Sequence, residues 1–528
     1  MAAKLRTLYT ICACWMWACF LTAIAQGQGT WKLLVQNAGI SSIHTAVTHF
    51  GTVVLLDRTD IGPSMIKLPN GRCRDDSSDL TLTHDCTAHS VLFTPGSNTI
   101  RPLFISTDTW CSSGQFVANG TLVQTGGDFD GNMKVRYFTP CQAKEFCDWV
   151  EASDQKLQNG RWYATNQLLP DGRQIVVGGR GSTTVEFIPS NAQRTNFLPF
   201  LNNAAYYPLV HLLPNGHLFM LIQKNSILYD YAANVVVRTY ETIPGQDQGR
   251  TYPVSGSSVL LPLDVKNGFT LGEVVVCGGG SYGQFAPASQ TCGRIRATDA
   301  SATWAMETMP IRRTMGDMVL LPTGDVLIIN GAQNGKAGWG FANNPALNPV
   351  LYSSVAPANH RFAILQASTI PRMYHSTANL LPDGSIFVAG SNSHQFYTFS
   401  GEFPTELRLE AFSPPYLDPI NLRNKPIITR APLSISYNTQ FRLVVSVPNI
   451  RPVNLEVNIL SAPFTTHAFS QGQRMLKLAV VRQINHHKGL HFLTIGAPPN
   501  NVVAPSAYYM LFVVNAGIPS VAAWVRVL

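Results

Sequence analysis

The chain has 528 residues, of which 45% are hydrophobic and 13% charged, and this composition is typical of a compact, strand-rich protein larger than one ordinary core. The formal net charge of +8 is mild for this length, and the sequence contains no run of Lys and Arg and no interleaving of basic with aromatic residues. This argues against nucleic acid as a partner. The positive charge is compatible with a weak association with acidic cell-wall polysaccharide.

Residues 1–25 have the pattern of a secretory signal peptide. Lys4 and Arg6 precede an apolar run, and Ala23-Ile24-Ala25 provides a cleavage site of the small-x-small type. The run is short, and no other segment reaches about 18 uninterrupted apolar residues, so we predict no membrane anchor. We therefore expect a secreted, extracellular protein, which in a plant means the apoplast or cell wall, with one glycosylation sequon at Asn119.

A hairpin motif recurs between residues 26 and 413. Its clearest copies are Tyr163-ATNQLLPD-Gly172 and His375-STANLLPD-Gly384, in which the Pro-Asp-Gly turn closes a hairpin between two apolar runs. The residue nine positions before the turn glycine, or the matching residue when the hairpins are aligned on Leu-Leu-Pro, is called the slot residue here. The slot residues are Ser42, Cys111, Tyr163, Tyr207, Ser255, Met315 and His375. Their spacing of roughly 50 residues predicts a seven-bladed kelch-type β-propeller over residues 26–413, with the slots near its axis.

From about Pro414 the motif stops and short alternating strands follow, such as FRLVVSV and AYYMLFVVN. These strands predict an immunoglobulin-like β-sandwich over residues 414–528, so the expected fold class is all-β. A loop between two of the strands, Ser461-APFTTHAFSQGQRM, carries His467. This histidine gains importance only if the loop reaches the centre of the propeller.

The number of cysteines points to one unusual thiol. Of ten cysteines, Cys12, Cys14 and Cys19 lie in the signal peptide, which leaves seven in the mature chain. An odd number is unusual in an oxidising compartment. Three local pairs are predicted to form disulfides: Cys73 with Cys86, Cys141 with Cys147, and Cys277 with Cys292. The remaining Cys111 could be an ordinary buried thiol, but its slot beside that of Tyr163 favours a functional role.

At this point five residues in chain order resemble a known active site. Cys111, Tyr163 in RWYATN, Tyr374-His375 in RMYHSTANLLPDG and His467 in TTHAFSQGQR are similar to the site of the copper-radical oxidases, the family of glyoxal oxidase and galactose oxidase. The similarity extends over nearly the whole mature chain, and its wording most resembles plant glyoxal oxidases. The resemblance implies one copper ion bound by Tyr163, Tyr374, His375 and His467, and a thioether between Cys111 Sγ and the Tyr163 ring.

The chemistry of these groups agrees with that implication. Imidazole nitrogens with phenolate oxygens suit Cu(II) better than structural zinc. Copper transfers one electron, whereas oxidation of an alcohol or an aldehyde hydrate removes two, so a sulfur-substituted Tyr163 is expected to store the second as a radical. The resemblance implies that Tyr374 is the general base, that the Tyr163 radical abstracts the C–H hydrogen, and that O₂ leaves as hydrogen peroxide.

The substrate is expected to be a small aldehyde that reacts as its hydrate. Galactose oxidases place a tryptophan over the thioether shortly after the cross-linked tyrosine, whereas the stretch from Gly178 to Phe187 has none. We therefore expect a site lined by small groups, with Arg180 as a candidate contact. The alternatives are a primary alcohol or galactose-type oxidase with the same site, and a non-catalytic kelch module that binds a glycan or a protein. The oligomeric state is not predicted.

Overall fold

The computed structural model describes residues 27–142, 145–190, 195–202, 205–447, 455–486 and 489–528, so the expected signal peptide lies outside the described residues. The helices within these ranges are short 3₁₀ turns: η1 (Thr59–Ile61), η2 (Pro69–Gly71), η3 (Phe129–Gly131), η4 (Val265–Asn267), η5 (Ala358–His360), η6 (Pro415–Leu417) and η7 (Pro419–Asn424). None of them is long and apolar enough for a membrane crossing. The remaining elements are strands, which confirms the prediction of an all-β protein.

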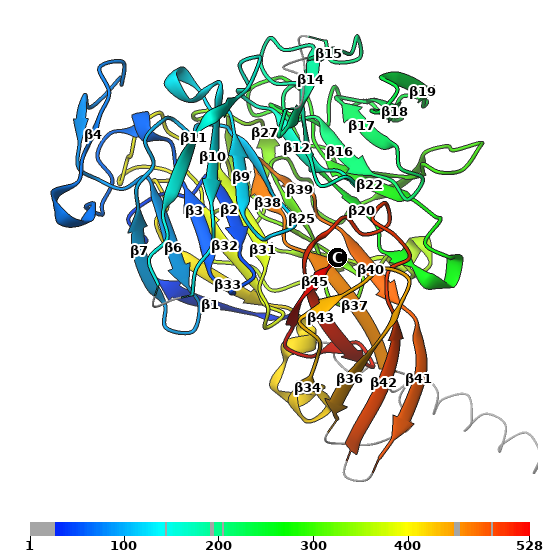
Figure 1. Cartoon of the computed structure of the whole chain (residues 1–528). Helices are drawn as coiled ribbons and strands as arrows, with labels where there is room; N and C mark the ends of the chain where they lie inside the picture. Colours follow the sequence, from blue (N-terminus) through cyan, green and yellow to red (C-terminus); the bar gives the residue numbers. More distant parts are fainter. Residues whose placement is uncertain (1–26, 143–144, 191–194, 203–204, 448–454, 487–488) are drawn as a thin grey trace, which may run out of the picture.

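Most strands before residue 414 form antiparallel groups of four that follow one another along the chain (Figure 1). The first three groups are β2 (His44–Val47), β3 (Val53–Leu56), β6 (Ser90–Thr94), β7 (Thr99–Leu103); β8 (Ser113–Phe116), β9 (Leu122–Thr125), β10 (Lys134–Phe138), β11 (Trp149–Lys156); and β12 (Thr165–Leu168), β13 (Gln174–Val177), β14 (Thr184–Ile188), β15 (Asn196–Phe197). The next groups are β16 (Leu209–Leu212), β17 (Leu218–Ile222), β18 (Asn225–Asp230), β19 (Val235–Thr239); and β20 (Gly256–Leu260), β22 (Glu273–Gly278), β23 (Thr291–Arg296), β24 (Ala305–Thr308). They are followed by β25 (Asp317–Leu320), β26 (Val326–Ile329), β29 (Val350–Tyr352), β30 (Phe362–Ile364), and by β31 (Ser376–Leu380), β32 (Ile386–Gly390), β33 (Leu409–Ser413).

The last group is completed by the start of the described chain. Strand β1 (Thr30–Val35) pairs antiparallel with β33, with Thr30 opposite Ser413. The first strands of most neighbouring groups pack against each other, β31 against β2 among them, so the groups surround a common centre. Two short hairpins extend from the groups: β4 (Arg74–Asp75) with β5 (His84–Asp85), and β27 (Ala332–Gly335) with β28 (Ala342–Pro345).

The glycines that end several second strands allow the backbone to pass close to a neighbouring group. Gly278 and Gly390 both have positive φ, and a Cβ on Gly278 would lie 2.4 Å from the carbonyl oxygen of Arg313. A larger residue is therefore excluded by sterics as well as by the backbone conformation. This close approach lets each second strand end beside the segment that begins the next repeat.

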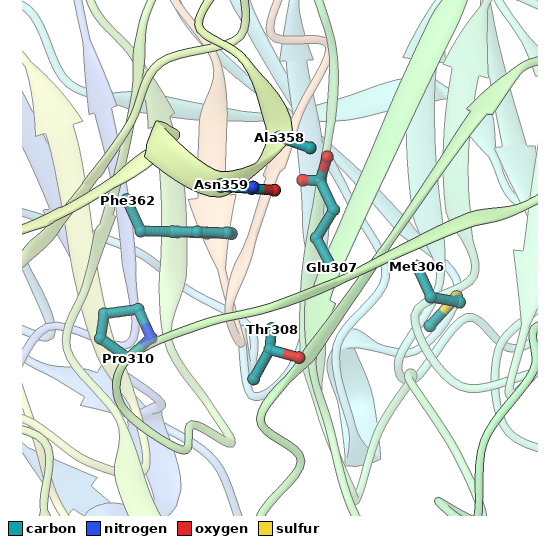
Figure 2. Close-up of a pocket in the computed structure, with 7 residues that line it drawn as sticks. All are labelled: Met306, Glu307, Thr308, Pro310, Ala358, Asn359 and Phe362. Carbon is teal, nitrogen blue, oxygen red and sulfur yellow. The ribbon is translucent and has the colours of Figure 1, made fainter.

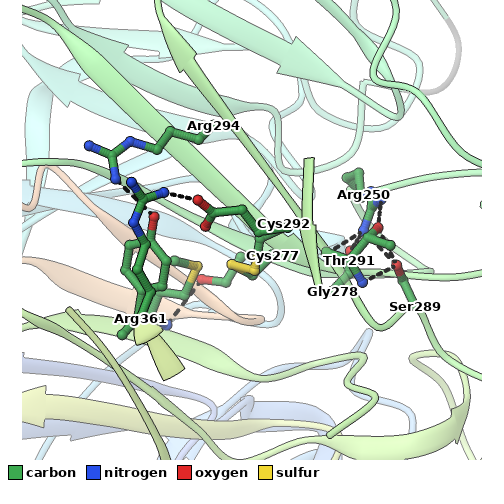
Figure 3. Close-up of a disulfide and its surroundings, with 12 residues drawn as sticks. Arg250, Cys277, Gly278, Ser289, Thr291, Cys292, Arg294 and Arg361 are labelled. Carbon is green, nitrogen blue, oxygen red and sulfur yellow. Dashed lines mark hydrogen bonds and ion pairs between the residues drawn. A yellow bond between two sulfur atoms is a disulfide. The ribbon is translucent and has the colours of Figure 1, made fainter. Parts of the chain in front are cut away.

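Buried arginines bind the same strand ends, a feature that no local sequence pattern predicts. Arg161 and Arg372 each donate Nη1 to the carbonyl of a strand-end glycine, Gly178 and Gly390 respectively, at 2.7 Å. Arg250 donates in the same way to Gly278, as Figure 3 shows beside the Cys277–Cys292 disulfide. Each guanidinium thus satisfies carbonyl groups that would otherwise be buried without a partner.

The predicted disulfides are confirmed. Cys73 is joined to Cys86, Cys141 to Cys147, and Cys277 to Cys292, where the last pair links opposite residues of β22 and β23. Cys111 is buried and is the free cysteine of the described residues. Asn119 is exposed in the turn between β8 and β9.

The C-terminal segment forms two sheets that share one core, and a short strand from the preceding region joins the edge of the second sheet. One sheet has the order β34 (Ile427–Arg430), β36 (Gln440–Ser446), β42 (Leu490–Gly496), β41 (Val480–Asn485). The other has the order β21 (Leu263–Asp264), β40 (Met475–Leu478), β37 (Leu455–Ser461), β43 (Ala507–Asn515), β45 (Ala523–Val527), β35 (Ser434–Ile435), with β44 (Ile518–Pro519) paired to β43. Leu443 and Ile495 of the first sheet and Val457 and Val513 of the second are buried in the same hydrophobic cluster.

One hairpin of the C-terminal segment leaves the sandwich and enters the centre of the strand groups. It consists of β38 (Phe464–Thr466) and β39 (Phe469–Gln471), and β38 pairs with β2, with Thr466 opposite His44. Besides β2, the hairpin contacts the first strands β8, β12, β20, β25 and β31. Figure 1 shows β38 and β39, coloured as C-terminal segments, among strands of much lower number. The turn of this hairpin carries His467.

Candidate metal centre

A backbone conformation is shared by most slot residues. Cys111, Tyr163 and His375 have φ values of 51°, 66° and 66°, and Tyr207 and Met315 are also positive. Such values are uncommon for residues other than glycine and persist only where the surroundings enforce them. Here the slots support one another, because the Tyr163 amide donates to the Cys111 carbonyl at 2.9 Å and the Tyr207 amide to the Tyr163 carbonyl at 2.7 Å.

The five residues singled out by the sequence come together in this structure. Cys111 is fully buried, and Tyr163, Tyr374, His375 and His467 are at most 6% exposed. The Cys111 sulfur lies 3.2 Å from Nε2 of His467. One ligand atom from each of Cys111, His375 and His467 lies within 4.8 Å of the other two. A thiol from β8's group, an imidazole from β31's group and an imidazole from the C-terminal hairpin therefore face one point.

Hydrogen bonds determine which nitrogen of His467 is available. Burial lowers the pKa of His44 to about 3, so this ring is neutral, and its Nε2 must donate to the Thr109 carbonyl at 2.9 Å. His44 Nδ1 then accepts from the Thr466 hydroxyl at 2.7 Å, and Thr466 Oγ1 accepts from His467 Nδ1 at 2.6 Å. This leaves the lone pair of His467 Nε2 directed at the centre, as metal-binding histidines require.

The imidazole of His375 is also suited to bind a metal. Nε2 of His375 is buried and has no hydrogen-bond partner among the described residues. Burial and the nearby positive charge of Arg58 lower the pKa of His375 well below its usual value, so the ring is neutral. A buried nitrogen without a partner is costly in free energy, and a coordinated cation would satisfy it.

Three phenols lie next to one another at the centre. The hydroxyl of Tyr252 lies 3.1 Å from that of Tyr163 and 3.1 Å from that of Tyr374. Burial raises the pKa of Tyr163 and of Tyr374 well above the usual value, so without a cation both phenols stay protonated. A bound metal ion reverses this preference by stabilising the phenolate. The raised pKa values of the two tyrosines and the lowered pKa values of the histidines thus fit a cation site.

Cys111 stands beside Tyr163 as an unoxidised thiol. Burial raises the pKa of the Cys111 thiol well above its usual value, and the nearby Tyr163 side chain opposes this shift in part. Both side chains belong to one small cluster with Trp110, Tyr207 and Ile43. The contact between sulfur and phenol is what a thioether between these two residues requires.

Several residues of the centre were not foreseen from the sequence. His44 and Thr466 orient His467, Tyr252 bridges two phenols, and the ring of Tyr207 lies 4.7 Å from that of His467. The slot position alone marked Tyr207, to which no role had been assigned. Tyr252 precedes the Ser255 slot, but nothing in its neighbourhood distinguishes it from a packing residue.

The expectation of a site lined by small groups is wrong. The ring of Trp162 lies 4.7 Å from that of Tyr163, and Trp110 lies 5.0 Å from Trp162. These tryptophans directly precede the slot residues Cys111 and Tyr163, so the residues that follow Tyr163 do not indicate them. Arg180 is exposed and covers the Trp162 ring at 4.8 Å, and no contact of its side chain with the five central residues is found.

The side chain of Arg58 is a buried cation that lies next to the Trp110 ring. The guanidinium carbon of Arg58 lies 4.3 Å from the centre of the Trp110 ring and 5.7 Å from that of Trp339. Its Nε lies 3.5 Å from the carboxylate of Asp60, whereas Nη2 has no hydrogen-bond partner among the described residues. The indole nitrogens of Trp110 and Trp162 are also buried without such a partner. Hydrogen-bond donors are therefore available beside the centre.

One small cavity lies at the centre, and a wider hollow lies away from it. A small cavity of about 10 Å³ lies against Tyr374, His375 and His467. A wider hollow of about 420 Å³ lies at the outer strands, between β24 and the segment of η5 and β30 (Figure 2). It contains Glu307 and Phe362 but none of the five central residues, so the wider hollow has no part in the chemistry of the centre.

Two imidazoles and two phenols are buried beside a free thiol where the first strands of an all-β repeat fold meet, and this donor set suits copper. Residues 43–416 match the family described as glyoxal oxidase N-terminus, and residues 425–527 match the galactose oxidase-like, Early set domain. The chain therefore belongs to the glyoxal oxidase family.

Relatives and a solved structure agree with this assignment. The chain is 51% identical to aldehyde oxidase GLOX of Vitis pseudoreticulata, over 96% of this chain and 98% of the relative. It is 39% identical to aldehyde oxidase GLOX1 of Arabidopsis thaliana, over 94% and 84%. A fungal alcohol oxidase of the AA5 family, solved in complex with copper, has the same fold, with a TM-score of 0.74 at 19% identity over 95% of this chain and 100% of that one.

Proposed function

We propose that this chain is a secreted copper-radical oxidase that converts small aldehydes, as hydrates, into carboxylic acids and reduces O₂ to hydrogen peroxide. The observation that carries the proposal is the free Cys111 beside Tyr163, in a cluster with two neutral imidazoles. The names of the plant relatives, which are aldehyde oxidases, support the substrate class. Three disulfides support an oxidising, extracellular location.

Tyr163, Tyr374, His375 and His467 would hold one copper ion. When bound, copper supplies a Lewis acid for the substrate oxygen and a place for one of the two electrons. Tyr163 and Cys111, joined through a thioether, would supply the place for the other electron as a ring-centred radical. We assign no further role to the metal.

Two residues of the chain then act directly on the hydrate. Tyr374, as a phenolate, takes the proton of the hydrate O–H as general base, and the Tyr163 radical takes the hydrogen atom of the C–H bond. The hydrate loses two hydrogen atoms and becomes the carboxylic acid, and O₂ accepts them as hydrogen peroxide. His44 and Thr466 keep His467 in the required tautomer, and Trp110 and Trp162 exclude water from the thioether pair.

A copper-loading experiment separates this function from that of a binding module. The purified mature protein is incubated with Cu(II) in air and digested, and the peptides are examined by mass spectrometry. A cross-linked Cys111–Tyr163 peptide that has lost two hydrogen atoms, together with peroxide formation from methylglyoxal, is expected. A free Cys111 thiol after copper loading would favour a non-catalytic kelch module. A cross-linked protein that oxidises only primary alcohols or galactose would favour the galactose-type alternative.

We further propose a weak association of the secreted enzyme with acidic polysaccharide. Its support is the positive net charge of the chain, which favours attraction to anionic glycans. Retention on an acidic polysaccharide matrix at low salt tests this association.

A further inference from the structure

The positive charge of the chain is concentrated in its C-terminal domain. Residues 425–528 contain nine Lys and Arg residues and a single acidic residue, Glu456. Their formal charge of +8 equals that of the whole chain, so residues 1–424 are neutral overall. A protein surface normally mixes both signs, and an asymmetry of this size between domains indicates an interaction with an anionic partner.

Three of these arginines share one face of the sheet β34-β36-β42-β41. Strand alternation buries Leu443 and Leu493 in the core and directs the residues between them outward. Arg442 and Arg482 both lie opposite Thr494 of the strand between them. Arg430 lies opposite Val444, which faces Phe492 in the neighbouring strand. The outward face therefore has a central apolar strip with arginines around it, and we call it the arginine face.

The arginine face is hollowed, and its cations have no partner among the described residues. Arg430, Arg442 and Arg482 are exposed, and none of them makes an ion pair or a side-chain hydrogen bond within the part of the chain that the structure describes. They line a groove of about 720 Å³ together with Phe492, which is 41% exposed, and Ile484. No acidic residue occurs in either of the two segments that form this sheet, 427–446 and 480–496. The groove thus offers positive charge and apolar surface, without a carboxylate that would neutralise it.

The groove lies away from the candidate metal centre. In Figure 1 the strands β34, β36, β42 and β41 form the end of the sandwich farthest from β38 and β39, whose hairpin carries His467. A partner bound there would not contact the five central residues. Binding at the arginine face would therefore anchor the enzyme without blocking catalysis.

We propose that the arginine face binds a linear polysaccharide that carries carboxylate groups. The guanidinium fork pairs with carboxylates through two parallel hydrogen bonds, and a repeating polyanion contacts several arginines at once, which multiplies weak contacts into measurable affinity. Phe492 and Ile484 offer apolar surface to the sugar rings between the charges. The choice of a polysaccharide over nucleic acid or a membrane rests on the extracellular location in the proposed function. It does not rest on the oxidase chemistry.

The test measures binding of the mature protein to polygalacturonate by calorimetry at about 0.1 M salt, with neutral galactan as the comparison ligand. A triple variant R430Q, R442Q, R482Q is compared with a control triple variant K67Q, K156Q, K266Q, which removes the same charge from exposed lysines of the propeller region. We expect at least a tenfold weaker affinity for the arginine-face variant and less than a twofold change for the control. The wild-type affinity should fall steeply with added salt.

Three other binding results would contradict the proposal. Equal losses in both triple variants would mean that only net charge matters, and equal binding to galactan would exclude recognition of carboxylates. Tighter binding to vesicles that contain anionic phospholipid would assign the arginine face to a lipid surface. Peroxide formation from methylglyoxal is measured in all proteins and is expected to be unchanged in both variants. An inactive wild type that still binds polygalacturonate through these arginines would overturn the oxidase proposal and leave the arginine face intact.

Discussion

Thr466 and His467 are neighbours in the chain, and the Thr466 hydroxyl accepts a hydrogen bond from Nδ1 of His467 at 2.6 Å. The same hydroxyl reaches His44 in the first strand group, so the C-terminal hairpin and the propeller region jointly set the tautomer of one expected copper ligand. The centre is therefore built from residues of both the propeller region and the C-terminal hairpin.

Replacing Thr466 with Val keeps the shape of the side chain and removes the acceptor for His467 Nδ1. We expect the affinity for copper to fall by about 10- to 100-fold, because the imidazole loses the partner that orients it. A copper titration against a competing chelator measures this. Thr465→Val is the matched control, since Thr465 Oγ1 bonds Asn379 and Ser470 and has no contact with His467. Equal losses in the two variants would mean that hairpin stability, rather than imidazole orientation, sets the affinity.

Replacing His467 with Ala should abolish peroxide formation and reduce the copper content of the folded protein. His467 is the contribution of the C-terminal domain to the centre, and its Nε2 faces Cys111. The control is His211→Gln, because His211 is equally buried but bonds Ser258, outside the centre. Metal analysis and thermal melting are measured together, so that unfolding is not mistaken for loss of a ligand. Wild-type activity in the alanine variant would refute the assignment.

Replacing Cys111 with Ala should leave the copper content within about twofold and reduce turnover by several orders of magnitude. The thiol is expected to modify the Tyr163 ring rather than to bind the metal, so its removal takes away the cross-link and the stable radical. The radical absorption of the oxidised protein and the mass of the Tyr163 peptide are the measurements. A variant that keeps both the radical signal and the turnover would exclude the thioether.

The substrate panel should favour small aldehydes. We expect kcat/KM for glyoxal or methylglyoxal to exceed that for galactose by at least about tenfold, which corresponds to about 1.4 kcal/mol of transition-state stabilisation. A peroxidase-coupled assay with both panels decides this. Preference for galactose or for simple primary alcohols would overturn the aldehyde assignment while leaving the radical mechanism in place.

Arg58→Met should lower kcat/KM for methylglyoxal more than for propanal. Arg58 Nη2 has no hydrogen-bond partner among the described residues, and the guanidinium lies beside Trp110, where it can donate to a second oxygen of the substrate. The same factor of loss for both aldehydes would show that Arg58 acts on the fold or on the electrostatics of the centre, and not on that oxygen.

Asp317 should make stability depend on pH. The carboxylate is buried, with a hydrogen bond from Asn330 at 2.8 Å, and burial raises its pKa to about 8. The folded state thus holds a proton that the unfolded state releases near pH 4, so stability falls as pH rises between about 4 and 8, by at most about 1.4 kcal/mol per pH unit. Asp317→Asn should flatten this dependence. Urea unfolding at pH 5 and pH 7.5 measures it, and an unchanged slope in the variant would assign the effect to another group.

The sequence by itself determined the features that depend on neighbours along the chain. The Pro-Asp-Gly turns and the apolar runs beside them indicated the hairpins, and the odd number of cysteines marked Cys111 once three local pairs were removed. These signals are readable because each depends on a few consecutive residues or on a count. The five central residues could be named together only through a resemblance, since no local pattern relates His467 to Cys111.

Only the tertiary structure decided which groups surround those five. Tyr252, His44 and Trp162 reach the centre from three different strand groups, and in the sequence each has the environment of an ordinary packing residue. Their roles come from distances between segments about 90 to 420 residues apart, which strand pairing and burial set and which no local pattern contains. The arginine face also depends on the tertiary structure. The excess of positive charge can be counted in the sequence, but strand register places the three arginines on one side of a sheet.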